Sequence, residues 1–377
     1  VGQIFLRLLF MLVIPLIVSA LALGVAGLGD LRALGRVGLR TLACTVVFSS
    51  TAAVIGVVLV NLIEPGVGLP EASRQALVPH APAPAPAPAS APSGMDFLVG
   101  MVPNNAVRAM ADGDMLAVMV FALFLGIGLA SVRSPAVERF TEGLQGLYEV
   151  TMRLLGLVIG AAPIGVACLM FTLTARLGYQ VLGQLASYVA VVVLGLALQQ
   201  FGVYALAVRW FGGMRPREFF RGVRTAMLTA FSTSSSNATL PTSLAVAESE
   251  LRLPPNISRF VLTVGSTANQ NGTALFEGVT VLFLAQFFGV ELSPAQQLSV
   301  VGICILGGIG TAGVPAGSLP VIAMILGLIG VPPEGLGVIL GVDRLLDMCR
   351  TVVNVTGDLA VAAVVSCGQG AAARPSP

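Results

Sequence analysis

Long runs of hydrophobic residues fill most of this chain, and short polar segments separate the runs. About 20 predominantly apolar residues in a helix cross the hydrocarbon core of a bilayer, so runs of this length predict transmembrane helices. The pattern therefore predicts an all-α, polytopic membrane protein. The apolar spans lie near residues 4–29, 38–62, 114–132, 146–174 and 180–210, with a short amphipathic region around 95–112.

After residue 212 the apolar runs contain clusters of Ser, Gly, Asn and Pro. These clusters interrupt the runs at 225–247, 260–290 and 300–331, and a charged helix follows at about 335–366. Non-helical backbone at membrane depth is tolerated only where protein buries it or where it lines a cavity. Two of these interrupted segments, 225–247 and 300–331, each precede a long helix with polar residues at its middle. Such a pair indicates the midplane site of a secondary transporter.

The charged helix carries its polar residues on one face. At about 100° per residue, five of them fall within an arc of roughly 80°: Asp343, Asp347, Arg350, Asn354 and Asp358. Each charge at the bilayer centre costs on the order of 2.5–3.5 kcal/mol on insertion scales. The stripe must therefore face a protein interior or a cavity, and it is the first candidate site. A self-neutralised Asp–Arg network that only holds helices together is the alternative. With Arg344 counted, three acids stand against two bases, which favours a cation site.

Composition supports a membrane protein. The chain is 56% hydrophobic and 10% charged, with a mean hydropathy of +0.92, whereas a soluble domain has about 25% charged residues. All 20 basic residues are arginines. They gather at 32–40 and 209–224, which the positive-inside rule places in the cytoplasm, and segment 63–93 is then external. We expect a multi-pass protein of the plasma (inner) membrane, and no basic stripe indicates nucleic acid.

Several other chemistries are excluded. The five cysteines lack paired spacing, so neither disulfides nor zinc are expected. The sole histidine, His80, lies in the low-complexity Pro/Ala tract 80–93, and a serine-hydrolase triad would need a histidine near the serine cluster. We therefore predict neither an enzyme nor an organic cofactor.

The interrupted segments hold further candidates, each with a structural alternative. The serines at 234–236 are typical of a re-entrant tip whose hydroxyls and amides meet a carboxylate, or of a capped cytoplasmic turn. Polar residues at 269–273 could bind a hard cation through freed carbonyls, or form a glycine kink. Glu277, one turn later, could carry a proton or pair with an arginine. The glycine-rich segment 307–315 is typical of a gating tip or a close-packed turn.

Together these segments resemble the glutamate transporter family, the dicarboxylate/amino acid:cation symporters. The matching motifs are SSSNATLP, NQNGT in place of the usual N-M-D-G-T, GTAGVP, DMCRTVVNVTGD, GRVGLR and APIGV at 162–166. The match runs from the first residue to about 366, and we expect the family's first transmembrane helix to be missing, since the chain starts with Val inside an apolar run. The resemblance implies a homotrimer of elevator transporters with inverted repeats.

The resemblance also implies a division of the chain into a scaffold and a transport domain. Its parts are a scaffold helix at 1–37, a transport-domain helix at 38–62, an external loop at 63–113, scaffold helices at 114–175, a transport-domain helix at 176–212, the first re-entrant hairpin at 213–255, a broken helix at 256–292, the second re-entrant hairpin at 293–333, the charged substrate-binding helix at 334–366 and a tail at 367–377.

Site residues follow from the same motifs. Arg350 would bind the substrate's side-chain carboxylate and Asp347 its amino group. The whole implied substrate set is Ser235, Ser236, Thr273, Gly313, Val314, Asp347, Arg350, Thr351 and Asn354. The implied sodium ligands are Thr267, Asn269, Gly308, Ile309, Thr311, Asn354 and Asp358. Glu277 is the candidate proton carrier.

Two departures from the family pattern bear on coupling. Asn271 stands where the family has an acid, and Phe48-Ser49 lies where sodium-coupled members carry Thr-Ser after aromatic residues. Loss of a carboxylate removes most of a site's attraction for sodium, so we expect no third, deep sodium site. Animal members have a protonatable glutamate at the position of Glu277, and archaeal sodium-only members have glutamine. Proton coupling, alone or with fewer sodium ions, is therefore expected.

The predicted function is symport of acidic amino acids, glutamate or aspartate, driven by sodium, protons or both. A proton-driven C4-dicarboxylate symporter is the alternative, and Asp347 argues against it because carriers of that class tend to lack this acid. A non-transporting membrane scaffold with decayed ion sites is a third hypothesis, suggested by the altered segment 269–273. A channel is less favoured, because the charges cluster in one pocket.

Overall fold

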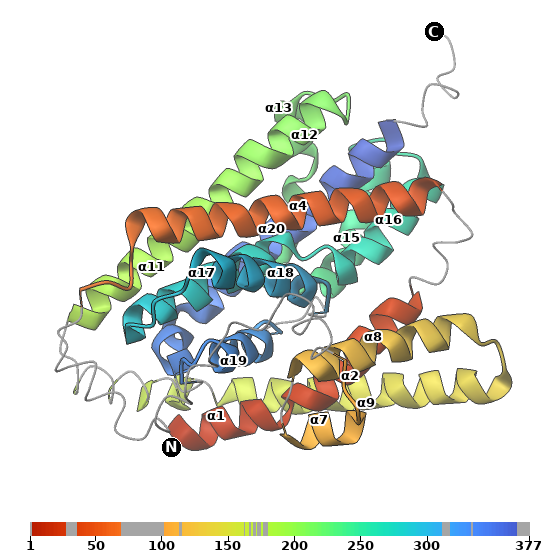
Figure 1. Ribbon diagram of the computed structural model, residues 1–377. Coiled ribbons are helices and arrows are strands. Elements are labelled where there is room, and N and C mark those ends of the chain that lie inside the picture. Colours follow the sequence, from red (N-terminus) through yellow and green to blue (C-terminus); the bar gives the residue numbers. More distant parts are fainter. Residues whose placement is uncertain are drawn as a thin grey trace, which may run out of the picture.

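The computed structural model describes residues 2–27, 36–68, 102–112, 115–161, 180–310, 317–332 and 335–367, with a few residues between 163 and 175. Throughout these ranges the regular structure is helical, which confirms the all-α prediction (Figure 1). The Pro/Ala tract and residues 311–316 lie outside the described residues.

One group of helices comes from the first half of the chain. Its members are α1 (Gly2–Met11), α2 (Val13–Gly27), α7 (Ala106–Asp112), α8 (Met115–Ser131) and α9 (Pro135–Gly160), which pack around α2 and α8. Gly126 lets those two helices meet, because a Cβ there would lie 2.7 Å from the carbonyl oxygen of Ala22.

Two predicted spans in this group were wrong in detail. The span predicted at 4–29 is two helices that separate at Leu12, just ahead of Pro15, whose ring is incompatible with an uninterrupted helix. The span predicted from 146 is a helix from Pro135 onwards. Its first turns include Glu138 and Arg139, so a search for apolar runs overlooks them.

A second group surrounds the charged helix. Here α4 (Arg36–Ile63) runs antiparallel to a continuous span made of α11 (Gln180–Ala197), the π-helix η2 (Leu198–Val203) and α12 (Tyr204–Trp210). Gln199 bonds to the carbonyl of Phe48, and Gln184 bonds to the carbonyl of Val67 beyond the end of α4. This pairing brings the start of α4 and the end of α12 to the same end of the molecule, as the arginine distribution requires.

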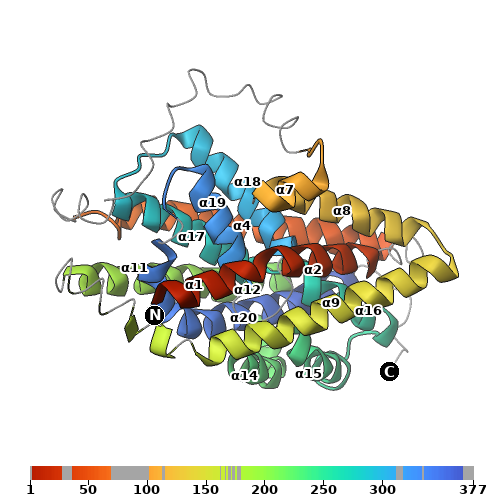
Figure 2. The same cartoon turned by 90° about the horizontal axis from the view of Figure 1, so that it is seen from below.

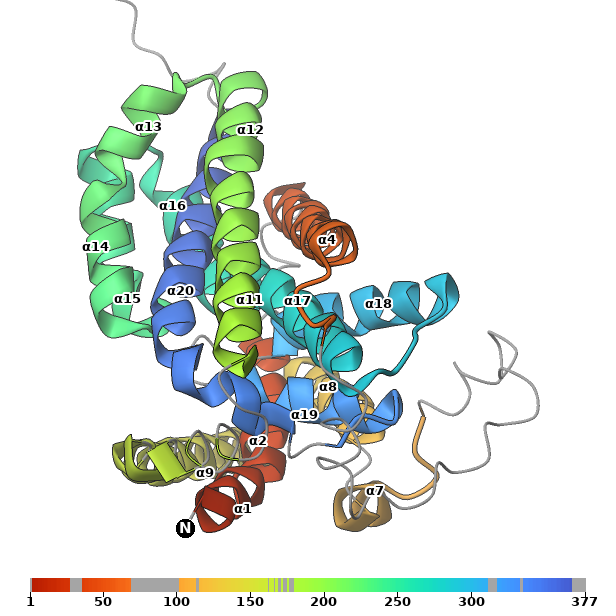
Figure 3. The same cartoon turned by 90° about the vertical axis from the view of Figure 1, so that its left-hand side faces the viewer.

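Two helical hairpins flank the centre of this group. After α13 (Pro216–Gly222), the first hairpin is α14 (Arg224–Thr233) and α15 (Ser236–Ser249), and the second is α18 (Pro294–Gly310) and α19 (Leu319–Leu328). Figures 2 and 3 show α14–α15 and α18 on opposite sides of α20 (Leu336–Cys367). The broken span, α16 (Pro255–Ala268) and α17 (Asn271–Phe288), contacts both hairpins and α20.

Among the described residues, four helices are long and apolar enough to cross a membrane: 37–63, 181–210, 255–288 and 336–367. In the first two, 39% of the most apolar window is buried, whereas the values for the last two are 89% and 78%. The two spans that carry the polar motifs are therefore enclosed by protein, and the outer spans present apolar surface. This is the arrangement that intramembrane charges require.

Candidate functional site

Arg350 is the centre of a buried ion cluster on α20. Its Nε and Nη2 lie 3.0 and 2.8 Å from one oxygen of Asp347, and its Nη1 lies 3.4 Å from Asp343. The guanidinium carbon lies 4.2 Å from the centre of the Phe276 ring, so the planar group also stacks on an aromatic face. Only 2% of the arginine side chain is exposed. The predicted charged face is thus turned into the protein.

Arg344, which had no predicted partner, joins the same cluster from outside. Its Nη1 lies 3.8 Å from Oδ2 of Asp347, and 57% of its side chain is exposed. Asp343, the other residue without a predicted role, helps to neutralise Arg350. The two aspartates and two arginines therefore balance in charge, and the uncompensated acid of this helix is the remaining one, Asp358.

Asp358 lies away from these arginines. Its carboxylate accepts a hydrogen bond of 2.8 Å from Nδ2 of Asn269 and is 4% exposed. Within the described chain, no arginine lies in ion-pair distance of it. The side-chain amide oxygen of Asn269 is buried and has no hydrogen-bond partner among the residues that the structure describes. Carboxylate and amide oxygens of this kind are what a hard cation such as sodium prefers.

The side chain of Asn354 forms hydrogen bonds with residues at the break between α16 and α17. Its Oδ1 accepts hydrogen bonds from the amides of Gly272 and Thr273 at 2.7 and 3.3 Å, so a side chain of α20 caps the first turn of α17. Its Nδ2 donates to Gln270 at 2.6 Å and to the Thr273 hydroxyl at 3.1 Å. Gly272 is needed here, because a Cβ would lie 2.6 Å from the carbonyl oxygen of Arg350.

Asn271, which stands where the family has an acid, takes part in a linear chain of hydrogen bonds. Its Oδ1 accepts from Ser49 at 2.7 Å, its Nδ2 donates to the Tyr204 hydroxyl at 3.0 Å, and that hydroxyl donates to the carbonyl of Val353 at 3.1 Å. The chain joins α4, α12, α17 and α20 with neutral groups.

Two glutamines in the span formed by α11, η2 and α12 contribute contacts that no sequence motif predicted. Gln200, in η2, donates to the hydroxyl of Thr356 at 3.0 Å, and Gln199 reaches α4. The available signal was a pair of glutamines in the middle of an apolar run. A π-helix often marks a functional site, and here two adjacent glutamines contact two different neighbouring helices.

Replacement of Gly357 by alanine is expected to lower stability by about 1–3 kcal/mol, the usual cost of overpacking. An added Cβ would lie 2.6 Å from the Tyr204 hydroxyl and 2.7 Å from Nδ2 of Asn271. Thermal melting of the purified protein would measure the effect. Gly302→Ala is the matched control, because apart from the adjoining backbone no heavy atom of the described residues lies within 4 Å of a Cβ there. Equal melting temperatures for the two variants would contradict the described packing.

Glu277 is fully buried, and neither carboxylate oxygen has a hydrogen-bond partner among the described residues. An ion pair with an arginine, the structural alternative, is not found in this part of the chain. The carboxylate faces the second hairpin, since a Cβ at Gly307 would lie 3.0 Å from Glu277 Oε2 and 2.6 Å from Val321. Gly307 therefore allows α18 to pack closely against both.

The tip of the first hairpin lies inside the protein. Ser234, Ser235 and Ser236 are 1%, 9% and 2% exposed, which favours a tip enclosed by protein over an exposed turn. Ser234 has left-handed backbone, with φ of 51°, and ends α14. Ser235 caps α15 by accepting a bond of 3.2 Å from the amide of Ala238. The hydroxyls of Ser234 and Ser236 are buried without a hydrogen-bond partner in the described chain.

The other predicted site residues have less distinctive places. The Thr351 hydroxyl donates to the carbonyl of Asp347, and Thr267 is half-buried. Gly308 faces the break between α16 and α17, with the Gln270 carbonyl oxygen 3.2 Å from where a Cβ would lie. Thr311, Gly313 and Val314 lie outside the described residues, and so does the side chain of Ile309.

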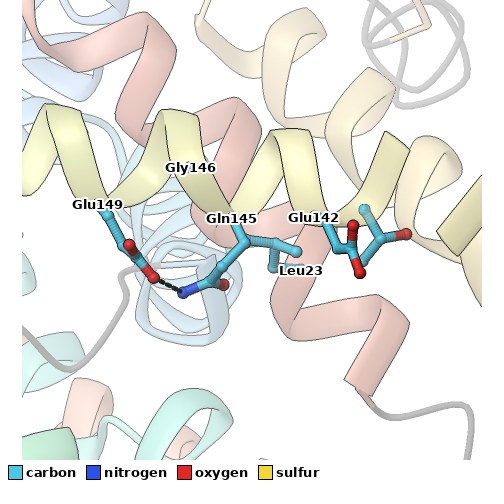
Figure 4. Close-up of a pocket in the computed structure, with 6 residues that line it drawn as sticks. Leu23, Glu142, Gln145, Gly146 and Glu149 are labelled. Carbon is cyan, nitrogen blue, oxygen red and sulfur yellow. Dashed lines mark hydrogen bonds between the residues drawn. The ribbon is translucent and has the colours of Figure 1, made fainter. Parts of the chain in front are cut away.

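A surface pocket lies on α9, where Glu142, Gln145 and Glu149 line it together with Leu23 of α2 (Figure 4). No lining residue belongs to α16, α17 or α20. The pocket is therefore separate from the charged site.

Comparison with known proteins agrees with the motifs. The model of the sodium:dicarboxylate symporter family matches residues 1–367. The chain is 33% identical over 374 residues to the proton/sodium-glutamate symport protein of Bacillus subtilis (strain 168), covering 98% of this chain and 86% of that protein. It is also 33% identical over 371 residues to the proton/glutamate-aspartate symporter of Escherichia coli (strain K12), covering 97% and 84%.

A carrier with another substrate is also similar. The C4-dicarboxylate transport protein of Rhizobium etli is 30% identical over 365 residues, covering 97% of this chain and 81% of that protein. The resemblance inferred from the motifs is thus confirmed over nearly the whole chain, which belongs to the sodium:dicarboxylate symporter family.

Proposed function

We propose that this chain is a secondary active transporter that carries acidic amino acids together with cations. The observation that supports this most directly is the buried pair of Arg350 and Asp347 at the middle of a membrane-spanning helix. An acidic amino acid has an ammonium group for the aspartate and a carboxylate for the arginine. The pair therefore matches both ends of the substrate, and relatives named as glutamate and aspartate symporters fit it.

Binding is proposed as an exchange of ion pairs. In this structure Nε and Nη2 of Arg350 bind the carboxylate of Asp347. Arg350 must release that carboxylate to hold the substrate's side-chain carboxylate bidentately. Asp347 then takes the substrate ammonium. Each of these charged groups thus exchanges one partner for another, and the net negative charge that the substrate adds is left for the coupling cations to balance. The hairpin serines 235 and 236, together with Thr273, Thr351 and Asn354, and with Gly313 and Val314, complete the proposed substrate site.

The coupling cations are proposed to bind on the Asp358 side of α20. Among the described residues, the buried Asp358 carboxylate has no cationic partner and the amide oxygen of Asn269 has no hydrogen-bond partner, so both can attract a sodium ion. The proposed ligands are these two residues with Thr267, Gly308, Ile309, Thr311 and Asn354. Asn354 caps α17 in this structure, so its oxygen is shared between two amides before any ion binds.

Glu277 is the proposed proton carrier. Its carboxylate is fully buried and has no hydrogen-bond partner among the described residues, and the change of exposure in the family's transport cycle would let it take up and release a proton. We further propose a plasma-membrane homotrimer in which α4 and α11–α20 move against α1, α2, α8 and α9 by an elevator motion.

Uptake into proteoliposomes under single gradients tests this function. We expect labelled glutamate to accumulate under a proton gradient without sodium, and Glu277→Gln to lose that net uptake while it keeps exchange of internal for external glutamate, because glutamine imitates the protonated acid and cannot release a proton. Glu248→Gln, in an exposed pair with Arg259, is the control. Strict sodium dependence would refute proton coupling, and the absence of uptake under either gradient would refute the transporter.

A proton-driven carrier of C4-dicarboxylates is the second candidate, favoured by the similarity to the Rhizobium etli protein. Anionic glutamate with one cation moves no net charge, so voltage-driven accumulation, worth about 2.3 kcal/mol per charge per 100 mV, needs at least two cations per glutamate. Charge movement measured with each substrate therefore also distinguishes the stoichiometries.

A further inference from the structure

Asp347 is approached by two guanidinium groups from two sides. Arg350 binds its Oδ1 from within the protein, and Arg344 lies 3.8 Å from its Oδ2. The two arginines differ in their surroundings. The side chain of Arg350 is 2% exposed, whereas that of Arg344 is 57% exposed. The outer arginine can therefore move toward or away from Asp347 without leaving a buried site.

This geometry matters for substrates that lack an amino group. In the proposed function, Arg350 leaves Asp347 to hold a substrate carboxylate, and the substrate ammonium replaces it. A dicarboxylate would occupy Arg350 in the same way but would bring no ammonium. Asp347, whose side chain is 5% exposed, would then be a buried carboxylate beside an anionic substrate. Breaking a buried ion pair from one side in this way is strongly unfavourable.

We propose that Arg344 is a specificity-determining residue that takes the place of the substrate ammonium at Asp347 and so admits dicarboxylates without an amino group. The inference rests on the proposed function, because it needs Asp347 to be the ammonium ligand. For an amino acid, the same guanidinium is a competitor, since it occupies the oxygen that the ammonium would use. Arg344 thus favours one substrate class at the expense of the other.

A plain surface salt bridge is the competing interpretation. Pairs of this spacing on exposed helices contribute little, and the chain contains one for comparison. Arg215 lies 3.9 Å from Glu218, three residues later, and both side chains are largely exposed. The pair of Arg344 with Asp347 has the same spacing but joins an exposed base to a buried acid. That difference is what gives Arg344 access to the substrate site.

The test compares aspartate with succinate, which differ only by the amino group. Each is measured as an inhibitor of labelled glutamate uptake by the full chain in proteoliposomes. In Arg344→Gln we expect succinate to bind at least about tenfold more weakly, a modest effect for a buried charge left without a partner, while aspartate binds as well or more tightly. Arg344→Lys should keep the ratio of the two affinities near its original value, and so should the control Arg215→Gln.

A loss of affinity for succinate relative to aspartate in Arg344→Gln, without such a loss in Arg344→Lys or Arg215→Gln, supports the proposal. Equal shifts for both inhibitors, an unchanged ratio, or succinate that fails to inhibit the unaltered protein while aspartate inhibits it would overturn the proposal and leave the proposed function standing. If neither acid inhibits and no glutamate is carried, the proposed function fails and this inference fails with it.

Discussion

Replacement of Arg350 by alanine is expected to abolish glutamate uptake in proteoliposomes. Truncating one partner of a buried, hydrogen-bonded charge pair costs about 2–5 kcal/mol, which corresponds to a loss of affinity of more than about tenfold. Among the described residues, Arg350 is the only arginine whose guanidinium is buried in this site, since Arg344 is mostly exposed. Labelled glutamate uptake at several concentrations measures the loss.

The same change removes the partner of Asp343 and Asp347, so folding needs its own control. Arg350→Lys keeps a positive charge but cannot form a bidentate pair. We expect this variant to melt near the unaltered protein and still to bind glutamate much more weakly. Size-exclusion profiles and melting temperatures separate the two effects. Uptake at the original level in either variant would show that Arg350 does not hold the substrate.

Replacement of Asp358 by asparagine is expected to remove the stabilisation that sodium brings. Binding at 100 times the dissociation constant stabilises a protein by about 2.7 kcal/mol, which raises its melting temperature. The carboxylate is buried with an asparagine as its hydrogen-bond partner, so asparagine at 358 keeps the shape and removes the charge. Melting temperatures with and without sodium, at constant ionic strength, report this directly.

Without sodium, this variant should melt no lower than the unaltered protein, because a buried charge without a counter-ion is itself unfavourable. Asp343→Asn is the contrasting change, since it removes an acid that pairs with Arg350. It should lower the melting temperature while the shift caused by sodium remains. A sodium shift that survives in Asp358→Asn would place the cation elsewhere.

Much of the architecture follows from local pattern. Apolar runs predict where spans lie, and interruptions at 234–236 and 269–273 predict the hairpin tip and the broken helix, since Ser, Asn and Gly end helices wherever they cluster. The first half was predicted less well. The charged turns of α9 form helix although they are not apolar, and hydrophobicity alone overlooks them.

The residues of the site could be predicted from the sequence, but which of them form ion pairs or hydrogen bonds with one another was less predictable. Asp343, Asp347, Arg350, Asn354 and Asp358 share a helix face in any α-helix, because the period of about 3.6 residues requires it. Which of them neutralise one another depends on rotamers and on neighbouring helices. Asp343 and Arg344 had no predicted partners for this reason.

The sequence alone therefore determined that this is a membrane-spanning, all-α chain with a charged helix face and a family resemblance, because hydrophobicity and helical period are local properties. The tertiary structure decided the rest. It closes the Arg350 cluster, keeps Asp358 out of ion-pair distance of every described arginine, places Asn354 on the amides of Gly272 and Thr273 some 82 and 81 residues away, and puts Arg344 outside. The contacts that α20 makes with α16 and α17 arise only when distant helices pack, so no window along the chain contains them. The ion pairs within α20 depend on the rotamers that this packing selects.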